Sequence, residues 1–374
     1  MRQQALLGAV CLLTILEAST AFSPDIRADT DRDGKVDLTG NTGVAGNAFW
    51  SNIRGAIFLP NIGDSHHKCS SQNLIGNPLS NAEIAGCHDA SGHLAIAPQF
   101  LATVKTVPTP GLPDQAYAHV YANLEAAYSR MRLFRRNKNQ STETSWYIVD
   151  KEFSFNASQL REGLDLGLDG REVATNSNIW NGDVVLKFYV FDEGSRASDT
   201  LALRLAPVLT HNHLQKVNTL ISVAANNATP TQEQSIQGSE DALQVAGVER
   251  PLLLLSQSDD IWAQDFIEPA FASMPGPDGP VSTRIILRFA QSIRTAGRQV
   301  FKQLRGNGIG RLQPAAGFGH REINSFGNLE TISPYTSKSG VEYKAGRIIM
   351  GKHFGELPLS RSWIFWRRRD CRSR

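Results

Sequence analysis

The chain has 374 residues, of which 41% are hydrophobic, and a formal net charge of +2 at neutral pH. This length has room for two domains of ordinary size. The near-neutral charge argues against a nucleic-acid or anionic-membrane partner. The basic residues Arg130–Lys138 are confined to one short segment, and we interpret them as solvent-exposed side chains of a loop or helix.

The first 21 residues have the parts of a secretory signal peptide. Arg2 supplies the positive charge, Ala5–Leu16 the apolar stretch and Ser19–Ala21 a small-residue cleavage site. The apolar stretch is shorter than the roughly 20 residues that span a bilayer, and no later segment is long and apolar enough to do so. We therefore expect a secreted, extracellular protein without a membrane span. Three sequons for N-glycosylation fit that compartment, at Asn139, Asn156 and Asn227.

Residues 22–194 are predicted to form an antiparallel β-sandwich. Short segments rich in aromatic and β-branched residues alternate there with turn residues, as in Gly55–Asn61, Ser145–Phe155 and Asp183–Gly194. One helix is expected across Asp114–Arg136. Its apolar residues recur close to the helical period, at Ala118, Tyr121, Leu124, Ala127 (or Tyr128) and Met131.

Beyond Gly194 the pattern changes to alternating strands and helices. Helices are expected at Gln232–Gly247 and Gly297–Gly306, both ending at glycine. Strands are expected at Leu203–Thr210, Lys216–Ala225, Pro251–Gln257 and Arg284–Gln291. The order of these elements favours a mixed α/β region after residue 194, and the family resemblance given below implies ββαβ units over residues 195–359.

Cys69 and Cys87 enclose a loop of moderate length in a compartment that we expect to be oxidising. A disulfide between them is one interpretation, and two unlinked thiols are the other. Nearby histidines raise the question of zinc, but the spacing matches no standard ligand set. Cys11 would be removed with the signal peptide, and Cys371 lies in a basic tail at residues 360–374.

A run of aspartates follows the predicted start of the sandwich, at Asp29, Asp31, Asp33 and Asp37. Their spacing copies the first half of an EF-hand loop, but Gly40 stands where the bidentate ligand of such a loop must be. Closely spaced carboxylates repel one another unless a hard cation neutralises them, so we expect calcium here. Asn61 and Asp64 could complete the ligand set. A solvated acidic loop is the alternative.

A second acidic segment, Ser256–Phe271, follows the apolar run Pro251–Leu255 and contains Trp262. Its carboxylates are Asp259, Asp260, Asp265 and Glu268. Carboxylates beside an aromatic ring form a pocket for a cation. A guanidinium fits best, because its N–H fork matches a carboxylate and its flat face stacks on the ring. The alternative is again an exposed acidic loop.

These segments resemble the peptidylarginine deiminases. The resemblance rests on IWAQDFIE (Ile261–Glu268) and SFGNLE (Ser325–Glu330), with GRIIMG (Gly346–Gly351) after them. Upstream, ADTDRDGKVD, RGAIFLPN and LRLAPVLTHN match in the family's order, so the similarity runs from about Asp25 to about Gly355. It implies an immunoglobulin-like domain at residues 22–194, then part of an α/β propeller. It also implies calcium-dependent deimination of arginine-containing proteins to citrulline.

The resemblance implies roles for single residues. Asp265 would fix the substrate guanidinium, Trp262 would cover its side chain, and Arg294, with Arg298 as an alternative, would hold the peptide carbonyls. A calcium ion would be bound by Gln264, Glu268, Phe326, Leu329 and Glu330. The family's neighbouring calcium site is expected to be lost, because Phe266 replaces a glutamate.

The family's chemistry also uses a cysteine nucleophile and a histidine followed two residues later by aspartate, both downstream of SFGNLE. His320 and His353 have no aspartate at that spacing, and Cys371 has no counterpart in the family. We therefore expect a deiminase that is truncated before its nucleophile and inactive as written. The alternative is a non-catalytic, secreted, calcium-binding β-sandwich protein.

Overall fold

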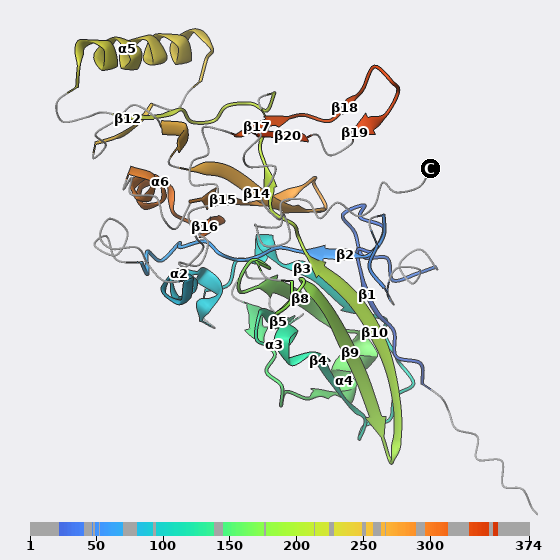
Figure 1. The fold of residues 1–374 in the computed structure, drawn as a ribbon. Coiled ribbons are helices and arrows are strands. Elements are labelled where there is room, and N and C mark those ends of the chain that lie inside the picture. The colour runs from blue at the N-terminus through green and yellow to red at the C-terminus, as the bar shows by residue number, and fades with distance from the viewer. Residues whose placement is uncertain are drawn as a thin grey trace, which may run out of the picture.

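The structure of the chain is a computed structural model. It describes residues 22–40, 47, 49–51, 53–69, 81–92, 95–137, 145–175, 177–212, 214–223, 228–248, 252–256, 263–265, 267–288, 296–312, 329–343 and 347–350. Within these ranges the fold is mostly β, with several sheets and few helices (Figure 1). The expected signal peptide and the basic tail lie outside them.

Two five-stranded sheets form the N-terminal part of the fold, which we call the two-sheet module. The first sheet has the order β1 (Ile26–Ala28), β3 (Ala102–Thr106), β8 (Asp165–Gly170), β5 (Met131–Arg136) and β6 (Trp146–Ile148). The second has the order β2 (Ala56–Phe58), β10 (Ser195–Leu205), β9 (Asp183–Asp192), β4 (Tyr117–Ala122) and β7 (Phe155–Asn156). All neighbours are antiparallel except β2 and β10, which are parallel.

Alternation of side chains along the strands explains how the two sheets share a core. In β9 every second residue is buried, because successive side chains point to opposite faces of a strand. Val104 and Leu166 of the first sheet belong to the same buried cluster as Leu186 and Leu203 of the second. Burying this apolar surface supplies the main stabilising free energy of the module.

The predicted helix across Asp114–Arg136 is wrong. This segment forms β4, a single short helical turn α3 (Glu125–Tyr128), and β5. In β4 the residues Ala118, Val120 and Ala122 are buried in alternation. The segment forms a strand and not a helix because pairing with β9 and β7 satisfies the backbone hydrogen-bonding groups of β4 and buries its inner face.

The expected domain boundary at Gly194 lies inside a hairpin. Gly194 has a φ of 86° in the turn between β9 and β10, and the two strands pair from Ser195↔Asp192 to Arg204↔Asp183. Residues 195–205 therefore complete the second sheet of the two-sheet module. The change of pattern that the sequence shows begins after Leu205.

A second, C-terminal group of elements follows. A four-stranded sheet has the order β11 (Leu209–Thr210), β14 (Glu268–Met274), β15 (Val281–Leu287) and β16 (Ile309–Leu312), with α6 (Ala296–Leu304) between the last two strands in sequence. Three two-stranded sheets pair β12 (Ile221–Val223) with β13 (Leu253–Leu255), β17 (Leu329–Ile332) with β20 (Arg347–Met350), and β18 (Tyr335–Thr336) with β19 (Glu342–Tyr343).

Helix α5 (Pro230–Val245) projects at one end of the molecule (Figure 1). Thr229 caps it in a capping box with Gln232, and Gly247 follows it with a φ of 63°. Both helices expected in this region, α5 and α6, are confirmed. Shorter helices are α2 (Asn81–Cys87), α4 (Ala157–Glu162) and the 3₁₀ turns η2 (Asp89–Ser91), η3 (Pro98–Phe100) and η5 (Ala263–Asp265). Among the described helices, none has the length and apolar character needed to cross a membrane.

The two groups of elements are joined through a continuous core. Ala270, Ala272, Ile285 and Leu287 of β14 and β15 belong to the same buried cluster as the two sheets. Gly308, with a φ of 68°, packs so closely on the ring of Phe100 that a side chain would collide with it.

Of the two interpretations that the sequence left open for Cys69 and Cys87, the structure shows the disulfide, with Cα atoms 5.1 Å apart. It ties the segment after β2 to the end of α2. Both cysteines are buried in a second cluster with Val300 and Phe301 of α6. The bond therefore holds a segment that packs against the C-terminal elements.

Candidate functional site

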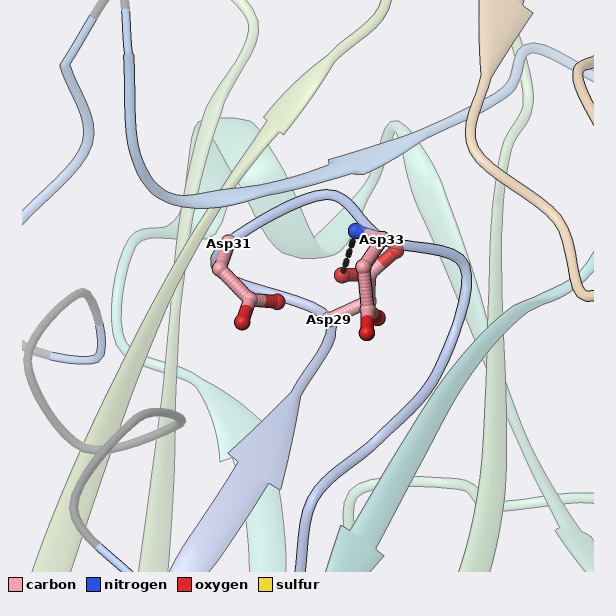
Figure 2. Close-up of side chains that lie close together, drawn as sticks. All are labelled: Asp29, Asp31 and Asp33. Atoms are coloured by element: carbon pink, nitrogen blue, oxygen red, sulfur yellow. Dashed lines mark hydrogen bonds between the residues drawn. The ribbon is translucent and has the colours of Figure 1, made fainter.

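Three aspartates converge in the loop that follows β1. Carboxylate oxygens of Asp29, Asp31 and Asp33 lie within 4.8 Å of one another (Figure 2). Asp29 is half-buried, whereas Asp31 and Asp33 are exposed. The spacing in sequence predicted this grouping, because alternate residues of a tight loop can turn toward the same centre.

Backbone turns hold the loop in place. The two carboxylate oxygens of Asp29 accept hydrogen bonds from the backbone N–H groups of Asp33, at 3.1 Å, and Gly34, at 2.9 Å. Gly34 has a φ of 91°, which glycine adopts at little cost. A side chain at Gly34 would also collide with the carbonyl group of Gly276, so the loop abuts the turn between β14 and β15.

The electrostatics of this triad favour a hard cation. Burial raises the pKa of Asp29, and the neighbouring carboxylates of Asp33 and Asp31 raise it further, while backbone hydrogen bonds oppose the shift. Negative charge is therefore costly in this loop. A divalent cation with oxygen ligands would offset that cost, and the donor set of three carboxylates fits calcium better than zinc.

The other residues expected to join this site have different surroundings. Asp37 contributes its backbone oxygen to the guanidinium of Arg27, at 3.1 Å. Asp64 is fully buried and lies against Arg305, at 3.0 Å, and the backbone N–H of Lys68, at 2.6 Å. Among the described residues, the carboxylates that lie close enough together to share one metal ion are those of the three loop aspartates. Asp64 is not among them.

Asn61 belongs to a buried ionic network that the sequence did not reveal. Its amide donates to Asp169, at 3.1 Å, and Asp169 also accepts two hydrogen bonds from Arg132, at 2.9 and 2.6 Å. The side chains of Arg132 and Asp169 are both 0% exposed. Burial raises the pKa of Asp169, and the hydrogen bonds from Arg132 counteract that shift. The network links the segment after β2 to β5 and β8.

The segment expected to bind a guanidinium joins β13 to β14. Asp265 ends η5, with Gln264 exposed just before it. Glu268 begins β14, half-buried and opposite Leu287 of β15. Leu329 and Glu330 begin β17, opposite Met350 and Ile349. For Asp265, Leu329 and Glu330 only the backbone is described. Trp262, Arg294 and Phe326 lie outside the described residues.

A cluster of buried arginines lies beside this segment, and it is a second feature that the sequence did not reveal. Arg288 follows β15, Arg298 is in α6 and Arg311 is in β16; each is at most 5% exposed. Burial, followed by the repulsion of Arg298 and Arg311, lowers the pKa of Arg288 to about 9. Burial and Arg298 lower the pKa of Arg311 to about 10. Arginines spaced this far apart in sequence leave no periodic signal, and only the sheet brings them together.

The comparisons with known proteins bear on the C-terminal elements. No curated protein matches the chain. Residues 195–368 match the family model described as Protein-arginine deiminase (PAD). This range includes the segment expected to bind a guanidinium, the arginine cluster and the β11–β14–β15–β16 sheet.

Proposed function

We propose that the C-terminal elements form the guanidinium-binding part of a protein-arginine deiminase, which hydrolyses arginine in proteins to citrulline in a calcium-dependent reaction. The observation that carries this proposal is the family match over residues 195–368. The proposed substrates are arginine-containing proteins or peptides.

In this proposal Asp265 pairs with the substrate guanidinium and Trp262 covers its aliphatic stem. Arg294 holds the peptide carbonyls. Calcium is bound by Gln264, Glu268 and Glu330 with the main chain of Phe326 and Leu329. The exposed position of Gln264 and the start of β14 at Glu268 are compatible with these roles.

A second calcium ion is proposed at Asp29, Asp31 and Asp33, in support of the fold. The contact between Gly34 and Gly276 supports a link between that loop and the β14–β15 hairpin. We further propose that the two-sheet module is an immunoglobulin-like domain and that the four-stranded sheet with α6 begins an α/β propeller. The disulfide supports our proposal of a secreted protein, because disulfides persist in oxidising compartments.

The test separates binding from turnover. Isothermal titration calorimetry with an N-acyl arginine amide, in calcium, measures recognition of the guanidinium by the 374-residue chain. Asp265→Asn should weaken binding about 10- to 100-fold, because it removes the charge from a charge-assisted hydrogen bond. The matched control is Asp241→Asn, which alters an exposed carboxylate of α5. Equal affinities for the arginine amide and its neutral citrulline analogue would contradict the proposal.

Turnover requires a thiolate as well as a bound guanidinium. Cys69 and Cys87 are joined in the disulfide, so neither supplies one. We therefore expect the 374-residue chain to bind the arginine amide without releasing citrulline, measured by colorimetric detection of the ureido group. Citrulline release that survives Cys371→Ser would show that the nucleophile has been misassigned.

A non-catalytic calcium-binding protein is the second candidate. The observation in its favour is that Asp29, Asp31 and Asp33 lie in the two-sheet module, outside the family match. Calcium-dependent stabilisation together with no detectable binding of the arginine amide would favour this candidate over a deiminase.

A further inference from the structure

One sequon lies at a well-defined position on the two-sheet module. Asn156, followed by Ala157 and Ser158, ends β7 and caps α4, and its side chain is exposed. Its Oδ1 accepts the backbone N–H of Gln159 at 3.0 Å. The cap thus uses the oxygen of the amide. The nitrogen, Nδ2, makes no hydrogen bond to any residue that the structure describes.

The residues opposite Asn156 form a row across the outer face of the sheet, where β4, β9 and β10 run side by side (Figure 1). In register, Asn156 faces Tyr117 on β4, Tyr117 faces Phe191 on β9, and Phe191 faces Arg196 on β10. Directly opposed residues of antiparallel strands point to the same face, with Cβ atoms about 4.5–5.5 Å apart. Asn156 and Tyr117 are therefore neighbours on the outer surface.

The neighbouring pair confirms which face this is. Ala118 and Phe155 are also directly opposed, and they are 0% and 1% exposed. Because side chains alternate along a strand, Tyr117 and Asn156 must point outward. Tyr117 is 43% exposed, although its ring is largely apolar.

The aromatic rings of this row form a stack that begins beside Asn156. The rings of Tyr117 and Phe191 stack with centroids 5.0 Å apart and an interplanar angle of 12°. His119 contacts both edge-on, at 5.7 and 6.0 Å. Phe191 thus covers one face of the Tyr117 ring, while Tyr117 as a whole stays 43% exposed. Because β7 lies on the opposite side of β4 from β9, the second face of the Tyr117 ring is turned toward Asn156.

We propose that Asn156 carries an N-linked glycan whose first sugar packs on the Tyr117 ring, on the face that Phe191 does not cover. The C–H groups on one face of N-acetylglucosamine are apolar and match the face of an aromatic ring. Strands lie roughly 4.8 Å apart, a separation close to the length of one sugar ring. The first sugar attached to Asn156 can therefore lie against the free face of the Tyr117 ring.

The chemistry requires a lipid diphosphate-linked oligosaccharide as the donor. Nδ2 of Asn156 forms a bond to the anomeric carbon of N-acetylglucosamine. The bond from that carbon to the diphosphate oxygen breaks, and the lipid diphosphate leaves with the electron pair. Nδ2 loses one proton to a base. Oδ1 stays an acceptor, so the cap of α4 is retained.

Modification is tested by expressing the full chain in a eukaryotic host that secretes it. Peptide mass spectrometry after treatment with a peptide N-glycosidase should show conversion of Asn156 to aspartate. Ser158→Ala removes the sequon but keeps the Asn156 cap, and the protein should then lose the mass of one N-glycan. Ser158 is exposed, so this variant folds as the parent does. An unmodified Asn156 peptide from secreted protein overturns the proposal, and so does failure of the host to secrete it.

Packing of the glycan is tested by thermal melting. Enzymatic removal of the glycan should lower the Tm by about 2–4 °C, a shift that corresponds to the loss of one stacking contact. In Tyr117→Ala the same treatment should leave the Tm unchanged. A matched control is Tyr147→Ala, an exposed ring on β6 of the other sheet, in which the shift should persist. An equal shift in Tyr117→Ala would show that the glycan does not pack on Tyr117.

Discussion

Arg305 and Asp64 are 241 residues apart in sequence, and a hydrogen-bonded ion pair of 3.0 Å joins them. Arg305 follows α6, and Asp64 lies in the segment after β2. Their side chains are only 8% and 1% exposed. Arg305 also donates to the backbone oxygen of Cys69. The guanidinium of Arg305 therefore holds the C-terminal elements against the segment around Asp64 and Cys69.

Replacing Arg305 should loosen this attachment. Arg305→Met leaves the carboxylate of Asp64 buried without its cation, which costs about 3–5 kcal/mol of unfolding free energy for a buried pair. The backbone N–H groups of Lys68 and Cys69 still reach Asp64, so we expect the lower end of that range. Urea denaturation measures the loss. The control is Arg161→Met, whose partner Asp114 is 91% exposed and whose loss should cost under about 1 kcal/mol.

Calcium should stabilise the protein through the aspartate triad. A ligand that binds only the folded state adds about 2.7 kcal/mol at a hundredfold excess over Kd. Thermal melts in calcium and in chelator should therefore differ, and Asp31→Asn or Asp33→Asn should shrink the difference. Asp241→Asn, on α5, serves as the control and should preserve it. Identical melts of the parent protein in both conditions would rule out the site.

The disulfide should contribute measurably to stability. Cys69 and Cys87 are 18 residues apart, and closing a loop of that length restricts the unfolded chain by about 3 kcal/mol. The Cys69→Ser/Cys87→Ser double variant should lose that much unfolding free energy in urea denaturation. Adding a reductant should lower the stability of the parent protein but leave the double variant unchanged. A parent protein that does not respond to reductant would contradict this expectation.

His88 should make the fold sensitive to acid. Its ring is buried, its Nδ1 lies 3.0 Å from the backbone oxygen of Arg171, and its Nε2 has no partner among the described residues. Burial lowers the pKa of His88 below its ordinary value near 6.5, against the opposing effects of Asp89 and Asp64. Between those two pKa values the unfolded chain binds a proton that the folded chain does not. The free energy of unfolding should therefore fall as the pH drops below about 6.5.

The measurement compares urea denaturation at several pH values in the parent protein and in His88→Gln. The variant should lose stability at neutral pH but depend less on pH between 6.5 and 5. His66→Gln, which changes an exposed histidine, is the matched control. If the parent and His88→Gln lose stability equally on acidification, the buried ring is not the cause.

Several elements could be predicted because their local sequence patterns are compatible with only one type of secondary structure. In β9 the strict alternation of apolar residues specifies a strand with one buried face. In α5 the following Gly247 marks the end of the helix as expected, whereas the helix begins at Pro230, two residues before the expected start. The grouping of Asp29, Asp31 and Asp33 also followed from sequence, since these residues share one short loop.

Other features depended on partners that are distant in the chain. The apolar residues of Asp114–Arg136 fit a helical period and also the inner faces of two strands, and only pairing of β4 with β9 decides between them. Asn61 and Asp64 were expected to bind calcium, yet they pair with Asp169 and Arg305, which lie far along the sequence. Local spacing carries no information about such contacts.

The sequence by itself determined the strand and helix content of most segments, the acidic loop and the family resemblance around Asp265, because periodicity, turn residues and motifs are local properties. Only the tertiary structure decided that Arg288, Arg298 and Arg311 share a buried cluster, and that Tyr117 lies beside Asn156. These relationships depend on strand register and on packing between sheets. The register in which two strands pair is specified by burial of one whole face of the sheet. It is therefore defined only in the folded chain.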